Sequence, residues 1–185
     1  PSTNLPAHFL YLLWFAFQLF GPSTYSLRVA TGLMGVATVV AAYLFGREYL
    51  GRMPALILAF FLAVSRWDVT FSRIGLHGVT TPLFELLALY FLLRALRTHS
   101  RIAFAWAGLL TGLGLCFYAS FRLFPIVVIV FLLHLALTQG KTFWREHSAN
   151  LALLVVAGLI ALSPVIQYAA DHREAFWART DKVSL

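Results

Sequence analysis

The polar residues that could do chemistry in this chain are concentrated in one short stretch, residues 65–78, between two long apolar runs. The stretch contains Arg66, Asp68, Arg73 and His77. If it forms one continuous helix, Arg66, Arg73 and His77 share a face at i, i+7 and i+11, and Asp68 points elsewhere. Such a face could bind an anion such as a phosphate. The alternative is a hydrated loop whose arginines lie among lipid headgroups.

The composition indicates an integral membrane protein. Hydrophobic residues make up 61% of the 185 residues and charged residues 11%, whereas a soluble domain carries about a quarter charged residues. At about 20 residues for each span, the chain is long enough for about six or seven spans. We therefore predict an all-α membrane protein, a polytopic helical bundle of about six transmembrane helices plus one interfacial helix.

The apolar runs and the turns between them divide the chain. Residues 8–20 would form only about 20 Å of helix, too short to cross a hydrocarbon layer of about 30 Å. We expect an external loop with an interfacial helix over residues 1–24, a six-span bundle over 25–168, and the start of an external polar segment over 169–185. Because the chain begins without Met and ends in a polar segment, we interpret it as an internal piece of a longer protein.

Two small-residue features have structural interpretations. The spacing of Gly108 and Gly112 is typical of helices that pack closely, and we expect that packing inside the bundle rather than between two copies. The single Cys116 lies in an apolar run and is interpreted as a small core residue. One cysteine makes neither a disulfide framework nor a cysteine metal cluster, and we expect no metal site and no cofactor.

The net charge of +7 favours lipid over nucleic acid as a partner. The basic residues are spread over several turns and form no stripe that could follow a nucleic-acid backbone. Anionic headgroups or a lipid-linked phosphate suit this distribution. With residues 169–185 set aside, the turns near residues 47–52, 94–101 and 141–145 are the more basic, so the positive-inside rule makes them cytoplasmic. Residues 65–78 and Arg122 are then external.

The external basic residues are our candidates for a lipid-phosphate site. An arginine binds phosphate oxygens through two parallel N–H donors. For any single arginine, the alternative is a contact with headgroups or with a helix C-terminus. The candidates are Arg66, Arg73, His77 and Arg122, with Asp68, His172 and Arg179 as further possibilities.

Four blocks of the sequence, residues 5–21, 26–47, 63–73 and 118–125, resemble the bacterial glycosyltransferase family 39 proteins. These proteins are relatives of protein O-mannosyltransferases and of the aminoarabinose transferase of lipid A. Residues 172–184 are also similar. The resemblance implies a GT-C fold in the bacterial plasma (inner) membrane. It further implies that a sugar is transferred from a polyprenyl-phosphate donor at the external face, with an acidic general base early in the first external loop.

That position of the family lies upstream of Pro1, so the catalytic acid is not visible here, and we do not assign its role to Asp68. The expected function is a membrane glycosyltransferase whose partners are a polyprenyl-phosphate sugar and membrane lipids. The alternative is a non-catalytic, transferase-derived structural or accessory subunit of a larger membrane complex, which would contact other membrane subunits. An Asp-Glu or Asp-Asp pair upstream would favour the enzyme.

Overall fold

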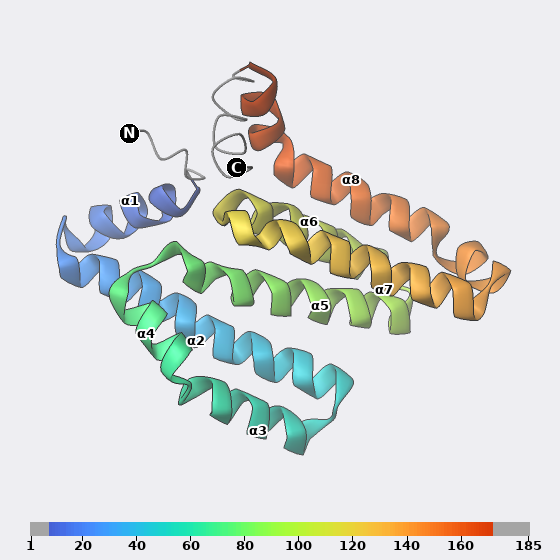
Figure 1. Cartoon of the computed structure of the whole chain (residues 1–185), viewed down its shortest axis with the longest axis horizontal. Coiled ribbons are helices and arrows are strands. Elements are labelled where there is room, and N and C mark those ends of the chain that lie inside the picture. The colour runs from blue at the N-terminus through green and yellow to red at the C-terminus, as the bar shows by residue number, and fades with distance from the viewer. Residues whose placement is uncertain (1–7, 172–185) are drawn as a thin grey trace, which may run out of the picture.

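The computed structural model describes residues 8–171, and every regular element in that range is a helix (Figure 1). The α-helices are α1 (His8–Phe20), α2 (Thr24–Tyr49), α3 (Arg52–Ala63), α4 (Arg66–Ile74), α5 (Thr80–Thr98), α6 (Arg101–Phe117), α7 (Phe124–Gln139) and α8 (Lys141–Asp171). Two short 3-10 helices, η1 (His77–Val79) and η2 (Ala119–Leu123), precede α5 and α7. This confirms the prediction of an all-α protein.

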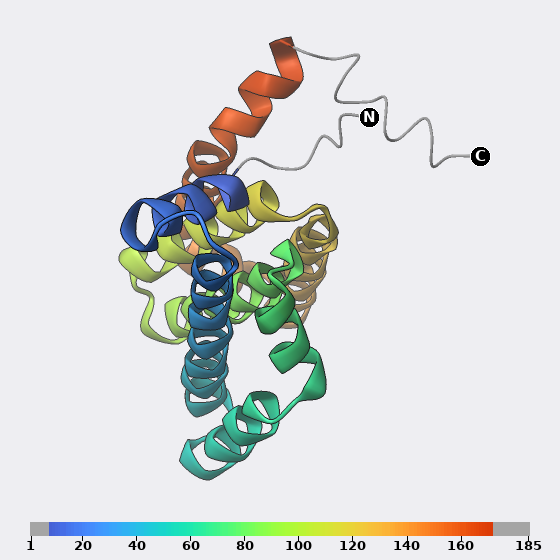
Figure 2. The ribbon, with the colours of Figure 1, turned by 90° about the vertical axis from the view of Figure 1, so that its left-hand side faces the viewer.

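The long helices run back and forth between two ends of the molecule. In Figure 1, α2, α5 and α7 begin at the end where α1 lies, and α6 and α8 run back toward it. We call this end the α1 end and the other the opposite end. The helix α1 has the bounds expected for the interfacial helix. It lies across the α1 end and turns away from the common direction of the other helices (Figures 1 and 2).

Four helical segments are long and apolar enough to cross a membrane: Thr24–Tyr49, His77–Thr98, Ser120–Gln139 and Lys141–Asp171. The helices α3 and α4 meet this criterion only as a pair, and they are bent by 51° where they meet. The remaining expected span, α6, has 17 residues, about 26 Å of helix. Each of the six expected spans thus has a helical counterpart, and four of these are long enough to span by themselves.

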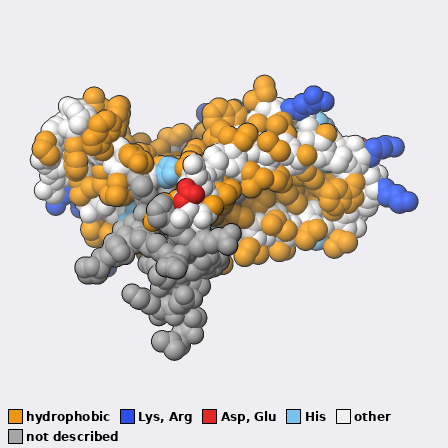
Figure 3. Space-filling view, turned by 90° about the horizontal axis from the view of Figure 1, so that it is seen from above, with side chains coloured by type: hydrophobic (Ala, Val, Ile, Leu, Met, Phe, Trp, Pro, Cys, Tyr) orange, Lys and Arg blue, Asp and Glu red, His pale blue; other side chains and the backbone are white. Residues whose placement is uncertain are grey.

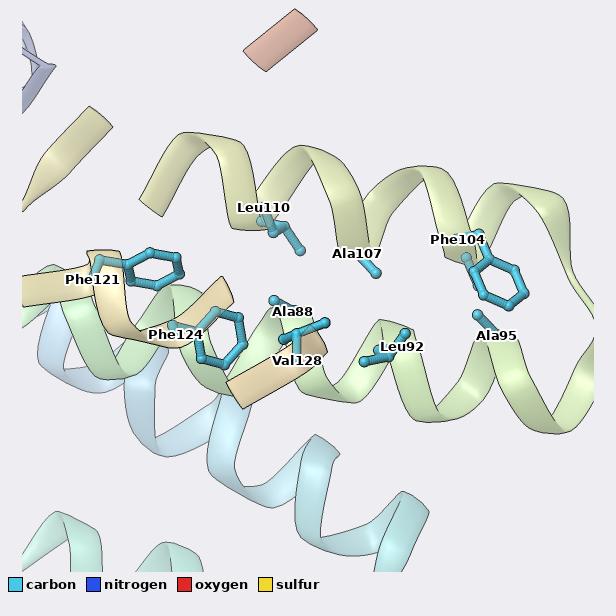
Figure 4. Close-up of a cluster of buried hydrophobic side chains, with 10 residues drawn as sticks. Ala88, Leu92, Ala95, Phe104, Ala107, Leu110, Phe121, Phe124 and Val128 are labelled. Atoms are coloured by element: carbon cyan, nitrogen blue, oxygen red, sulfur yellow. The ribbon is translucent and has the colours of Figure 1, made fainter. Parts of the chain in front are cut away.

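The buried core lies where α5, α6 and the start of α7 meet. Small residues of α5, among them Ala88 and Ala95, face Phe104 and Ala107 of α6. Phe121 of η2 and two residues of α7 complete the cluster (Figure 4). The alanines allow the helix backbones to approach closely, and the phenylalanine rings fill the remaining space between them.

The glycines of α6 let α8 pack directly against its backbone. A Cβ on Gly108 would overlap the backbone of Leu154, and a Cβ on Gly112 would overlap that of Gly158. Cys116, on the same helix, is buried near the carbonyl oxygen of Ala161. The interpretation of Gly108 and Gly112 as a packing motif inside the bundle is therefore confirmed.

The surface has the distribution expected of a membrane protein. Figure 3 shows mainly apolar side chains along the length of the visible face, with most Lys and Arg side chains toward its ends. On α3, large apolar residues such as Met53, Ile57 and Phe60 are more than half exposed. Contiguous apolar surface of this kind is rare on soluble proteins and suits contact with lipid.

Candidate functional site

A hollow of about 630 Å³ lies between α2 and α4 at the α1 end. Two arginines line it, Arg28 from the first turns of α2 and Arg73 from the last turn of α4. The rest of its lining is Thr24, Leu27, Gly32, Ser72 and Ile74. The hollow therefore combines two cationic groups with apolar and small side chains.

The local sequence explains how α4 presents Arg73. The helix ends at Gly75, whose φ of 80° lies in the left-handed region that glycine adopts without strain. A Cβ at this position would come within 2.7 Å of the Leu27 side chain, so glycine also allows the chain to pass close to α2. The last turn of α4 is thereby held beside Leu27 and Arg28.

The break at Gly75 corrects one prediction. Residues 65–78 do not form one continuous helix, because α4 stops at Ile74 and His77 begins the separate helix η1. Arg66 and Arg73 share α4 at an i, i+7 spacing, but His77 does not continue their face. The expectation of a single face with Arg66, Arg73 and His77 is therefore wrong.

The other face of α4 packs against α2. The buried hydroxyl of Thr31 donates a hydrogen bond of 2.6 Å to the carbonyl oxygen of Ser72. One turn further along α2, a Cβ on Gly35 would lie 3.0 Å from the Cβ of Ser72 and 3.6 Å from Oδ2 of Asp68. Asp68 is only 8% exposed, whereas Arg66 and Arg73 are exposed. As predicted, Asp68 points away from the arginines.

His77 is held among aromatic rings at the α1 end. Its ring centroid lies 4.9 Å from that of Tyr118 and 5.9 Å from that of Phe9 in α1. Its carbonyl oxygen accepts a hydrogen bond from the hydroxyl of Thr80. His77 thus joins α1 to the end of α6, and it does not line the hollow.

The remaining predicted site residues lie outside the hollow. Arg66 begins α4 at the bend after α3, and Arg122 lies in η2 at the α1 end; both are exposed and neither lines the hollow. His172 and Arg179 lie outside the described residues.

Sequence reasoning did not select Arg28 as a candidate. A signal was present, because Arg28 lies near the N-terminus of α2, where the helix dipole disfavours a cation. Arg73, in the last turn of α4, occupies a position where the dipole favours a cation. The helix dipole therefore accounts for Arg73 but not for Arg28, which makes Arg28 the more informative of the two.

The hollow has the features that an anionic headgroup with an apolar tail requires. Two guanidinium groups can bind phosphate oxygens. Thr24 places the N-terminus of α2 at the rim, and helix N-termini favour anions. Leu27 and Ile74 provide apolar contact.

A second hollow, of about 370 Å³, lies at the opposite end between α2 and α5. There Arg97 forms an ion pair of 3.0 Å with Glu48, and Arg94 donates a 2.6 Å hydrogen bond to the hydroxyl of Tyr90. Glu48 offsets the charge of Arg97, and its carboxylate would repel an anion here. None of the residues lining the hollow at the α1 end is acidic.

The profile of the family described as dolichyl-phosphate-mannose-protein mannosyltransferase matches residues 4–168. No curated protein and no solved structure matches the chain. The family match spans all of the helices up to Tyr168 in α8, including both helices that form the hollow.

Proposed function

Because this chain belongs to the dolichyl-phosphate-mannose-protein mannosyltransferase family, we propose that it binds a polyprenyl-phosphate sugar at the α1 end. In this proposal the sugar passes to an acceptor on the external face of a bacterial plasma membrane. Family membership supports a membrane glycosyltransferase with a lipid-linked sugar donor. The identity of the polyprenyl donor, the sidedness and the residues that contact the phosphate are our proposals.

The observation that carries the proposal is the pairing of Arg28 and Arg73 across one hollow. The two arginines come from different helices, and the contacts of Thr31 and Gly35 with α4 fix the distance between those helices. A phosphate in the hollow would lie between the two guanidinium groups. The polyprenyl tail would then leave along the apolar outer surface of α2 and α4.

Two arginines at this position would do more than bind the donor. In a polyprenyl-phosphate sugar the phosphate carries one negative charge, and the bond from the sugar carbon to a phosphate oxygen breaks during transfer. The leaving polyprenyl phosphate gains a second negative charge as that bond breaks. Cationic groups therefore stabilise the transition state more than the bound donor, which is the condition for catalysis.

The acceptor must also lose a proton to a base. Asp68 is not assigned this role, because it is buried against Gly35 of α2 on a different face from the arginines. In this proposal the described residues hold and polarise the donor phosphate. His77, between Phe9 and Tyr118, and the exposed Arg66 and Arg122 remain candidates for contacts with the rest of the donor.

The proposal is tested by donor binding to the purified protein in nanodiscs. A charge-assisted contact contributes about 1.5–3 kcal/mol, so Arg28→Ala and Arg73→Ala should each weaken binding of a polyprenyl-phosphate sugar about tenfold or more. Arg73→Lys should restore only part of the affinity, because lysine lacks the two-pronged donor geometry.

The matched control is Arg52→Ala, which removes an exposed arginine from the start of α3 at the opposite end. This variant should bind the donor as the wild type does. Unchanged affinity in both Arg28→Ala and Arg73→Ala would reject the hollow as the phosphate site and favour the accessory-subunit alternative.

A further inference from the structure

Three potential metal ligands meet at the opposite end of the bundle, away from the hollow with Arg28 and Arg73. His99 follows the last residue of α5, and Glu146 and His147 lie in the second turn of α8. Each offers one ligand atom, and these atoms all lie within 4.8 Å of one another. Two imidazoles and a carboxylate are the donor types of three-ligand zinc sites.

The buried ring of His147 has an unsatisfied nitrogen, an observation separate from the spacing of the three groups. His147 is only 4% exposed, and its Nδ1 is buried without a hydrogen-bond partner among the described residues. Its ring is stacked on that of His99, with the centroids 4.9 Å apart and the planes within 2°. The ring centroids of Phe143 and Phe104 lie 5.1 and 5.9 Å from that of His147. Most buried polar groups are satisfied, and a bound ion is one way to satisfy an orphaned one.

The backbone at His99 directs its side chain toward the start of α8. His99 has a φ of 52°, the one positive value among the non-glycine residues that the structure describes. A side chain in this region is uncommon and needs support from its surroundings. Here the left-handed residue ends α5 and places the His99 ring against that of His147.

The present spacing is wider than a closed metal site requires. With Zn–N distances of about 2.0–2.1 Å, tetrahedral ligand atoms lie about 3.3 Å apart. The side chains of His99 and Glu146 are exposed, so they can rotate toward an ion while the buried His147 stays in place. The His99 ring would leave its stack on His147, because an imidazole nitrogen binds a metal in the plane of its ring and the two rings are parallel. Neighbouring Arg101 and Arg145 are exposed, so solvent and salt screen their repulsion of a cation.

We propose that His99, Glu146 and His147 bind a divalent transition-metal cation of the zinc class, with water as the fourth ligand. Imidazole nitrogen suits zinc, nickel and copper, and the single carboxylate adds charge neutralisation. The ion would tie the turn between α5 and α6 to the start of α8. This site is separate from the proposed donor site and would stabilise the bundle rather than take part in sugar transfer.

The experiment measures zinc binding by the purified protein in nanodiscs. The protein carries an affinity tag that contains no histidine. Competition with a fluorescent zinc indicator should give about one zinc ion for each protein molecule. His99→Gln and Glu146→Gln change exposed side chains, so both variants should fold, and His99→Gln should weaken zinc binding at least about tenfold. Zinc should also raise the Tm of the wild type but not that of His99→Gln.

The matched control is His134→Gln, which removes an exposed histidine of α7 outside the cluster. It should bind zinc as the wild type does. X-ray absorption of the zinc-loaded wild type should show two imidazole ligands. The proposal is overturned if the wild type binds no stoichiometric zinc, or if His99→Gln binds zinc as tightly as His134→Gln does. The His99–His147 stack would then serve packing alone.

Discussion

The buried hydroxyl of Thr31 on α2 donates a 2.6 Å hydrogen bond to the carbonyl oxygen of Ser72 on α4, a residue 41 positions later in the chain. Thr31 lies one turn after Arg28 on α2, and Ser72 directly precedes Arg73 on α4. The bond therefore fixes the register of the two helices at the point where their arginines line one hollow.

Replacing Thr31 with valine should loosen the contact between α2 and α4. The substitution keeps the shape of the side chain but removes the donor to Ser72. Hydrogen bonds between membrane helices contribute about 0.6 kcal/mol on average and at most about 1.7 kcal/mol. Thr31→Val should therefore lower the free energy of unfolding by an amount of that size. Thr38→Val is the control, because the hydroxyl of Thr38 is also buried but donates its hydrogen bond to Met34 of its own helix. If thermal unfolding showed the same decrease in Tm for the two variants, the interhelical role of Thr31 would be contradicted.

Filling the hollow at Gly32 should block the donor without disturbing the fold. Gly32 lines the hollow, and a Cβ there meets nothing within 4 Å. Gly32→Ala should be neutral or stabilise α2 by about 0.5–1 kcal/mol, whereas Gly32→Phe should prevent donor binding. Gly35→Ala is compared with Gly32→Ala. The added Cβ at position 35 would lie 3.0 Å from the Cβ of Ser72, so this variant should have a lower Tm. Full donor affinity in folded Gly32→Phe would show that the donor binds elsewhere.

A side chain at Gly108 should force α6 and α8 apart. A Cβ would overlap the backbone of Leu154, and a backbone cannot move aside as a flexible side chain can. Overpacking typically costs about 1–3 kcal/mol, so Gly108→Val should lower Tm well below that of the wild type. Gly32→Ala controls for a β-carbon added to a helix glycine in open space. A Gly108→Val protein with wild-type Tm would show that α8 does not pack on α6 in this way.

The two ends of the bundle should be accessible from opposite sides of the membrane. Cysteines at the exposed Ser120 in η2 and Thr142 at the start of α8 should react with an impermeant thiol reagent from the external and cytoplasmic sides, respectively. The background variant is Cys116→Ala, which removes the one native cysteine. Labelling of both positions from the same side would contradict the alternation of the helices, and the reverse pattern would contradict the positive-inside assignment.

Much of the fold could be predicted from the sequence, because in a membrane each apolar run must satisfy its own backbone hydrogen bonds as a helix. The interfacial-helix prediction, residues 8–20, coincides with α1. Ser23, which precedes the next apolar run, accepts a hydrogen bond from the backbone N–H of Ser26 and caps α2. The family resemblance, read from blocks between residues 5 and 125, agrees with the family match over residues 4–168. These features depend on local composition and order.

The candidate sites could not be predicted in the same way, because they depend on which helix faces come together. Arg73 was selected from its polar surroundings, but its neighbour in the hollow, Arg28, lies on another helix whose rotation the sequence does not reveal. His77 left the expected face because Gly75 takes a left-handed conformation beside Leu27, a contact made only in the folded bundle.

The same reason explains the proposed metal site, where no metal site was expected. His99 and the pair Glu146 and His147 are far apart in the chain, and no ligand spacing links them. They meet because the glycines of α6 let α8 pack closely on it, and because the turn after α5 returns the chain into α6 beside the start of α8. Composition and order thus determined the helices and the family, whereas only tertiary packing, through the rotation and close approach of those helices, decided which polar side chains are neighbours.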